Sequence, residues 1–171
     1  MGVSLTDYAD ALAAKLREKL SDVPTIEADR PGRHQRSIKL PAIYLEIEDF
    51  TSLLEAGDSR LLTDVRWQAH CLVDPNADRA ELQLRAFCAR VAVALHEIRR
   101  PVAGHGHIRL IQASEDPFRP QVDGYLTWAV EFGIEIALGE LEPPGIRPTQ
   151  IMLGQAPAIG AGHADDYERI A

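Results

Sequence analysis

The stretch that decides the fold is DPNADRAELQLRAFCARVAVALHEIRR, residues 74–100. Either Asp74 or Asn76, on the two sides of Pro75, can accept hydrogen bonds from the first free backbone N–H groups of a helix, and Pro101 ends it. Because such a helix has one apolar stripe, it needs a sheet to cover. The apolar side chains recur every three or four residues, as on one face of an α-helix: Ala80, Leu84, Phe87, Cys88, Val91, Leu95 and Ile98.

Alternating apolar and polar residues predict strands on both sides of this helix. Residues 42–48 place Ile43, Leu45 and Ile47 on one face, and residues 63–73 alternate in the same way. After the helix, the alternation returns over residues 108–113 and 125–138. We expect these four segments to form the sheet, in two hairpins.

A second helix is predicted near the start of the chain, over residues 5–20. Ser4 and Asp7 have the spacing of a capping box. The residues after Val23 and Pro24 are charged, contain Pro31-Gly32 and show no periodicity, so they are predicted to be loop. One helical face is apolar over this segment: Leu5, Tyr8, Leu12, Leu16 and Leu20.

The predicted element order is helix, strand, strand, helix, strand, strand. It predicts an α+β fold over residues 1–139, in which a four-stranded, mostly antiparallel sheet carries two helices on one face. The inward-facing residues are then expected to form one core under the helices: Trp67, Phe87, Val91, Leu95, Trp128, Val130 and Phe132.

Residues 140–171 have a different character. The run Glu142-Pro143-Pro144-Gly145 breaks regular structure, and the following residues have neither a helical nor a strand period. Large apolar residues nevertheless occur among the glycines and prolines, which favours an extended arm that lies on a surface. That surface belongs either to the same domain or to another chain, and we predict the latter. The residues expected to make this contact are Ile151, Leu153, Ile159 and Tyr167.

Composition describes an ordinary globular chain of 171 residues with 46% hydrophobic and 26% charged residues. Its apolar runs are much shorter than a membrane span, so a cytoplasmic protein is the default expectation. The two cysteines, Cys71 and Cys88, are expected to be buried thiols without a disulfide.

The formal net charge of -8 argues against free binding to nucleic acid. One segment is an exception, because four basic side chains follow Asp29 with no further acid between them: Arg30, Arg33, Arg36 and Lys39. Two interpretations remain open: a solvated loop, or a contact with an acidic partner surface.

No group of residues has the pattern of a catalytic, metal or cofactor site. His105-Gly106-His107 lacks nearby cysteines or carboxylates, so it predicts a loop without a metal. Gly104-His105-Gly106 lacks the further glycine and the lysine of a phosphate-binding loop. We therefore expect no cofactor and no enzymatic activity.

The closing run LGQAPAIGAGHADDY, residues 153–167, resembles the C-terminal motif of a family of Mu-like phage and prophage proteins associated with the tail terminator role. Residues 40–45, LPAIYL, also resemble the place where such proteins begin their sheet. The resemblance implies a virion protein without enzymatic activity. It further implies a hexameric ring that caps the tail tube and joins it to the head–tail connector. The acidic charge of the chain also fits a lumen through which DNA slides without being bound.

A second hypothesis is a small ligand-binding or regulatory α+β module. It would hold its ligand on the open face of the sheet or in the connection over residues 49–59. A hexamer, or a monomer that assembles only on tail tubes, would favour the ring subunit. A stable dimer whose melting temperature rises with a metabolite would favour the module.

Overall fold

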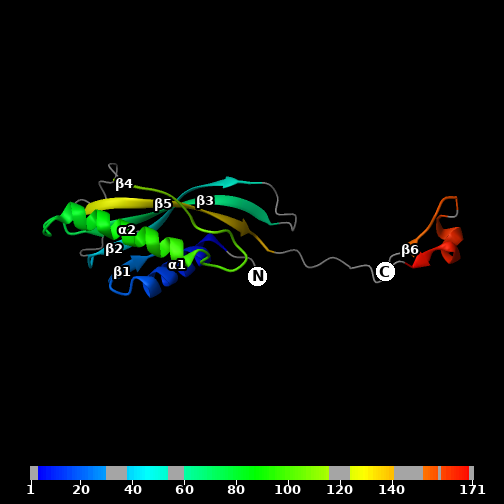
Figure 1. The fold of residues 1–171 in the computed structure, drawn as a ribbon, viewed down its shortest axis with the longest axis horizontal. Coiled ribbons are helices and arrows are strands. Elements are labelled where there is room, and N and C mark those ends of the chain that lie inside the picture. The colour runs from blue at the N-terminus through cyan, green and yellow to red at the C-terminus, as the bar shows by residue number, and fades with distance from the viewer. Residues whose placement is uncertain are drawn as a thin grey trace. The chain divides into compact units, whose positions relative to one another are not determined.

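The computed structural model of the chain describes residues 4–29, 38–53, 60–115, 124–140, 152–157 and 159–169. The chain divides into two compact units, Met1–Leu141 and Glu142–Ala171. The larger unit is α+β, as predicted, with two helices and a mixed five-stranded sheet (Figure 1).

The first helix, α1, spans Leu5–Lys19 and begins with the predicted capping box. The Ser4 hydroxyl oxygen accepts a hydrogen bond from the Asp7 N–H at 3.1 Å, and the Asp7 carboxylate accepts one from the Ser4 N–H at 3.2 Å. These two bonds satisfy backbone donors that have no partner within the helix. The Ser4 hydroxyl also donates to the Asp7 carboxylate at 2.6 Å, and this bond, followed by the one from the Ser4 N–H, lowers the pKa of Asp7.

The second helix, α2, spans Ala80–Ile98 and starts later than predicted. The Asp74 carboxylate accepts hydrogen bonds from the backbone N–H and the side chain of Asn76, at 2.8 and 3.2 Å, so it closes a local turn instead of capping the helix. The residue before the helix is Arg79, in a left-handed conformation with φ 51°. The predicted caps were therefore wrong, whereas the apolar stripe was right.

The sheet has the strand order β1-β2-β3-β5-β4. Four of its strands are the predicted ones, and every pair among them is antiparallel. The strands β3 and β5 pair along their whole length, from Leu61 with Leu138 to Val73 with Leu126. The bounds are β2 Ala42–Ser52, β3 Leu61–Val73, β4 Arg109–Glu115 and β5 Leu126–Leu138.

The predicted four-stranded sheet is corrected by a fifth strand, β1, at Thr25–Glu27. It runs parallel to β2, and its three residues are too few to show a period in the sequence. Two side-chain bonds hold it in place: Arg17 donates to the Ile26 carbonyl, and the Thr25 hydroxyl donates to the Lys39 carbonyl at 2.8 Å.

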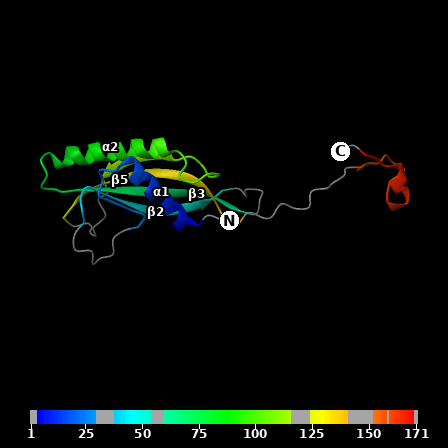
Figure 2. The same cartoon turned by 90° about the horizontal axis from the view of Figure 1, so that it is seen from below.

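The main core lies between the sheet and the two helices, which share one of its faces (Figure 2). Trp67 and Phe132 stack with ring centroids 6.3 Å apart. Six of the seven predicted core residues are buried, and Trp128 is the exception. It is half-buried at the rim, where the Arg85 guanidinium lies 5.5 Å from the ring centroid. The predicted core is otherwise confirmed.

The two cysteines are free and buried in this core, as expected. A contact with Cys88 and burial raise the pKa of the Cys71 thiol. Both side chains therefore act as small apolar groups.

The smaller unit is not extended throughout, which corrects the expected arm. Its strands β6, Met152–Leu153, and β7, Glu168–Arg169, pair antiparallel. Between them lies the 3-10 helix η2, Ala161–Asp166. The Tyr167 ring packs against Gly154, where an added Cβ would lie 2.7 Å from it, and the Tyr167 hydroxyl accepts from the Gly160 N–H at 2.8 Å. A single aromatic ring thus organises a segment with no periodic pattern.

Candidate functional site

The face of the sheet opposite the helices carries a network of polar side chains. The residues that pair across β2, β3, β5 and β4 are mostly charged or amides there, and neighbouring strands exchange hydrogen bonds. His70 Nε2 lies 3.0 Å from the Glu46 carboxylate, and Gln112 donates to Glu131 at 2.8 Å. These contacts tie the strands together.

One ion pair on this face spans three strands. Arg109 on β4 donates through one guanidinium nitrogen to both Asp64 oxygens on β3, at 2.6 and 2.7 Å. Gly133 of β5 lies between them, and an added Cβ there would be 3.0 Å from Arg109 and 3.3 Å from Asp64. The absence of a side chain at Gly133 lets the arginine reach across the strand.

A small apolar cluster lies at one end of the same face. It consists of Ala42, Tyr44 and Leu72, with Ile38, Leu40 and Tyr125 packed against it. Burial is the main cause that raises the pKa of Tyr44 to about 12. The segment entering β2 therefore covers part of the open face, where the ligand-binding hypothesis placed its site.

The predicted basic cluster is only partly within the described residues. Arg30, Arg33 and Arg36 lie outside them. Lys39 is described and exposed, and its backbone carbonyl holds β1. Whether these side chains form one surface stays a prediction.

The predicted contact residues of the C-terminal segment separate into two kinds. Leu153 and Ile159 are 47% and 54% exposed, whereas Tyr167 is half-buried and organises its own unit. Ile151 lies outside the described residues. Met152, which the sequence reading did not select, is also exposed.

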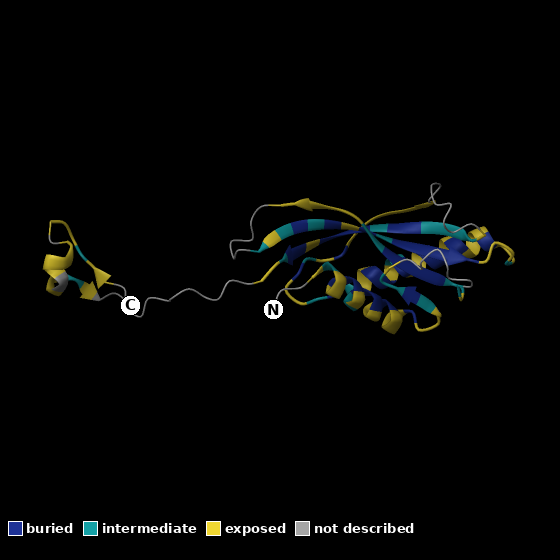
Figure 3. Cartoon of the chain, turned by 180° about the vertical axis from the view of Figure 1, so that it is seen from behind, coloured by how far each residue is buried: buried dark blue, intermediate teal, exposed yellow. Residues whose placement is uncertain are grey.

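The structure adds exposed apolar residues at the sheet edges. All seven residues of β4 are exposed, including Leu110 and Ile111. Residues 48–52 of β2 are exposed too (Figure 3). Phe50 among them is 55% exposed. Alternation in a sequence identifies strands but not which of them lie at an edge, so this surface was missed.

Helix α2 has a second apolar stripe on its outer face. Leu82 and Val93 are 58% and 57% exposed, and the exposed Ala86 and Ala89 lie between them at the spacing of a helical face. The four residues recur at intervals of four, three and four, a signal that the sequence carries but that the stronger inward stripe masks.

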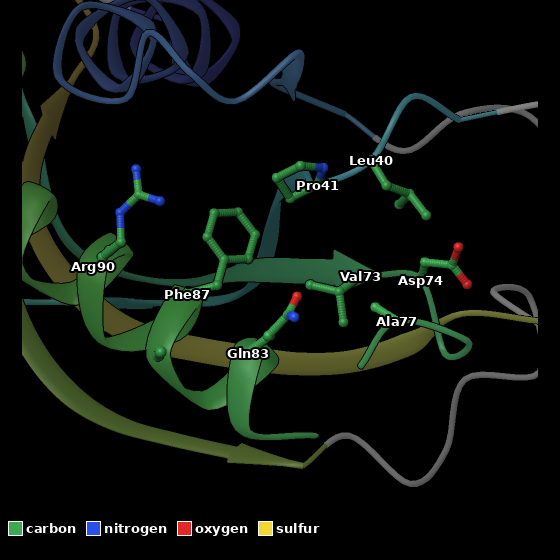
Figure 4. A pocket seen from close by; sticks show the side chains of 9 residues that line it. Leu40, Pro41, Val73, Asp74, Ala77, Gln83, Phe87 and Arg90 are labelled. Atoms are coloured by element: carbon green, nitrogen blue, oxygen red, sulfur yellow. The ribbon is translucent and has the colours of Figure 1, made fainter. Parts of the chain in front are cut away.

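A groove of about 400 Å³ lies beside this stripe (Figure 4). Its walls are apolar, with Leu40 and Pro41 before β2 on one side and Phe87 of α2 on the other. Arg90 is at one end, where its guanidinium pairs with Asp22 at 2.7 Å. That pairing lowers the pKa of Asp22 and occupies the arginine.

His105 has a structural role. Its ring is buried, its Nδ1 accepts from the Ala137 N–H at 3.3 Å, and it meets the Tyr8 ring edge-on at 5.6 Å. Burial, followed by the charge of Arg60, lowers its pKa. The nearby His107 is exposed. Within the described parts of the chain, no three His, Cys, Asp or Glu side chains gather as a metal site.

No protein-family model matches the chain, and no curated protein is significantly similar to it in sequence. Over the described residues, no helix has the length and apolar character needed to cross a membrane.

Proposed function

We propose that this chain is a structural subunit of a phage virion. In this proposal it is a tail terminator whose copies form a ring, likewise proposed to be hexameric, that caps the tail tube and joins it to the head–tail connector. The observation that carries the proposal is the distribution of exposed apolar residues over separate places: the outer face of α2, the two sheet edges and the C-terminal unit. A subunit of a closed ring needs different surfaces for its two neighbours, and further surfaces for the proteins above and below.

The C-terminal motif supports the same proposal. Residues 153–167, which resemble the phage family motif, fold around Tyr167 and leave Leu153 and Ile159 exposed. A segment that builds its own small framework and presents apolar side chains outward is suited to contact with another chain.

Charge is also compatible with a ring around DNA. The open sheet face carries Asp64, Glu131 and Glu135 against two arginines, Arg66 and Arg109, in a chain of net charge -8. An acidic surface repels phosphates, so DNA would pass such a face without being held. The proposed partners are the tube and connector proteins. In this proposal the chain is assembled in the bacterial host and resides in the tail or neck of the virion.

Two measurements test the proposal. Negative-stain imaging and native mass spectrometry of the purified chain, alone and with purified tail tubes, should show a ring, either free or at the tube end. In a prophage lacking the corresponding gene, the chain should restore completed tails. Tails that stay unfinished despite a folded, expressed chain would rule out the terminator role.

A second candidate function is a ligand-binding module, which the groove beside Phe87 favours. Its volume of about 400 Å³ and apolar walls suit a small molecule. A thermal-shift screen against a metabolite set tests it, with Ala86→Trp as the variant that fills the groove. A ligand that stabilises the native chain but not this variant would support the module over the ring subunit.

A further inference from the structure

The sheet ends in two edges that differ in sequence and in strand direction. Among the described residues, β4 pairs with β5 alone, so its other side is unpaired along seven residues. On the far side of the sheet, β1 pairs only with Ala42, Ile43 and Tyr44, which leaves the outer edge of β2 uncovered by β1 from residue 45 to 52. Unpaired strand edges are ready templates for another strand.

The short outer edge at β1, in contrast, is partly blocked by a side chain. Arg17 of α1 donates to the Ile26 carbonyl, and Ile26 itself is buried. Among the hydrogen bonds of the described residues, none joins a side chain to the backbone of β4 in the way that Arg17 bonds to β1. Among the described residues, no strand pairs with the outer edge of β4 or with that of β2 over residues 45–52, so another strand can pair there.

Their surfaces are complementary in apolar character. Phe50 on β2 and Leu110 and Ile111 on β4 are all between 41% and 55% exposed. Apolar side chains can therefore meet across a contact between the two edges.

Strand direction also fits. From β2 to β3, β3 to β5 and β5 to β4 every step is antiparallel, so β2 and β4 run in opposite directions. A rotation axis along the strands leaves their directions unchanged, so β4 of one copy would meet β2 of the next in antiparallel pairing. This contact is heterologous, which is the kind that closes into a ring.

We propose that β4 of one copy pairs with residues 45–52 of β2 in the next, so that the sheet continues from copy to copy. This inference deepens the proposed function by naming the contact between ring subunits, and it rests on that function only for the closure of the ring. The occupant of each edge is a second copy of this chain.

Bulges on both edges restrict what can pair there. The register shifts between Ile47 and Asp49 in β2, and between Leu110 and Gln112 in β4. A bulge twists the strand and blunts pairing with an arbitrary flat strand. A strand that pairs with either edge must therefore follow the local twist of that bulge.

The test uses one charged substitution on each edge of the full chain. Phe50→Lys blocks the β2 edge, and Ile111→Lys blocks the β4 edge. Each should weaken self-association by at least about tenfold, because a buried, unpaired ammonium is costly, without lowering the melting temperature. Leu61→Lys is the matched control, since Leu61 is 46% exposed and apolar but lies on β3, an inner strand of the sheet. It should assemble like the unmodified chain.

Mixing the two edge variants makes the experiment specific. Phe50→Lys keeps an intact β4, and Ile111→Lys keeps an intact β2, so the mixture should stop at a one-to-one dimer in native mass spectrometry, while each variant alone stays monomeric. A homodimer of either variant would show an isologous contact and overturn the proposal. Edge variants that assemble normally, or an unmodified chain that stays monomeric at millimolar concentration, would overturn it as well.

The strand pairing and the proposed function can be contradicted independently of each other. If the edge variants assemble and still complete tails, the pairing is wrong but the terminator role stands. If the edge variants lose self-association and the unmodified chain does not complete tails, the pairing stands and the role is wrong.

Discussion

Arg109 and Asp64 form an ion pair across a strand that neither belongs to, with one guanidinium nitrogen 2.6 and 2.7 Å from the two carboxylate oxygens. The side chain passes over Gly133 of β5, which joins the edge strand β4 to the centre of the sheet. An edge strand exposed on both faces has few apolar contacts, so this bridge fixes its position.

A double-mutant cycle measures that bridge. Arg109→Ala and Asp64→Ala, singly and together, should give a coupling of about 0.2 to 1 kcal/mol, because both side chains are more than a third exposed and water screens them. Repeating the cycle in Gly133→Ala should reduce the coupling toward zero, since the new methyl group meets both partners. An unchanged coupling in that background would show that the arginine does not need the glycine.

Truncating the inward stripe of α2 should be costly. Phe87 is buried at the helix–sheet contact, so Phe87→Ala is expected to lower the free energy of unfolding by about 3 to 5 kcal/mol. Leu82→Ala, on the exposed face of the same helix, should change it by less than about 0.5 kcal/mol. Chemical denaturation gives both values, and a loss below about 1 kcal/mol for Phe87→Ala would contradict the assigned core.

His105 should make stability depend on pH near neutrality. Burial lowers its folded pKa below the ordinary value of 6.5, so as pH falls through 6.5 the unfolded chain takes up this proton first. The contribution of His105 to stability is therefore complete above pH 6.5, and it decreases as the pH falls toward the folded pKa. Asp22, paired with Arg90, and Glu97, paired with Lys19, have lowered pKa values and titrate in a more acidic range.

The matched variants are His105→Gln and His107→Gln. Thermal melts between pH 5 and pH 8 give the slope of melting temperature against pH for each variant. His105→Gln should reduce this slope, whereas His107→Gln should keep it, because His107 is exposed. The same slope in both variants would assign the pH dependence to another group.

Gly154 should be intolerant of a side chain. In Gly154→Ala the new methyl group would lie 2.7 Å from the Tyr167 ring, so the pairing of β6 with β7 should be lost. Gly162→Ala meets no atom within 4 Å and should leave the unit folded. Amide hydrogen exchange over residues 152–169 separates these results, and equal protection in the two variants would contradict the role of Tyr167.

The basic segment provides a prediction that depends on the proposed function. Reversing Arg33 and Arg36 to Glu should leave the melting temperature unchanged and weaken particle assembly, more at low salt than at high salt, if these residues face an acidic partner. Normal particle yield at physiological salt would favour the solvated loop.

Periodicity in the sequence was enough to predict both helices and four strands, because each spans at least seven residues and all of them except β4 bury one face. Three features depend on contacts between distant residues and could not be read in this way. The strand β1 is held by Arg17 and by the Lys39 carbonyl, α2 begins after a turn closed by Asp74, and the C-terminal unit forms around Tyr167.

The proposed contact surfaces were only partly accessible from sequence. Leu153 and Ile159 were selected because apolar residues in an irregular segment need a surface, and both are exposed. Phe50 and Ile111 were not, since exposure at an edge is decided by strand order in the sheet.

The pairing of β3 with β5 has a consequence for the order of folding during synthesis. These two central strands are separated in the chain by α2 and β4, yet they pair along their whole length. Loops this long close slowly, and β3 has no partner on that side until residues 126–138 have left the ribosome. Until then, the apolar side of the β2–β3 hairpin is exposed to solvent. Fast translation through α2 would shorten that interval, and a chaperone would cover the apolar side while it lasts.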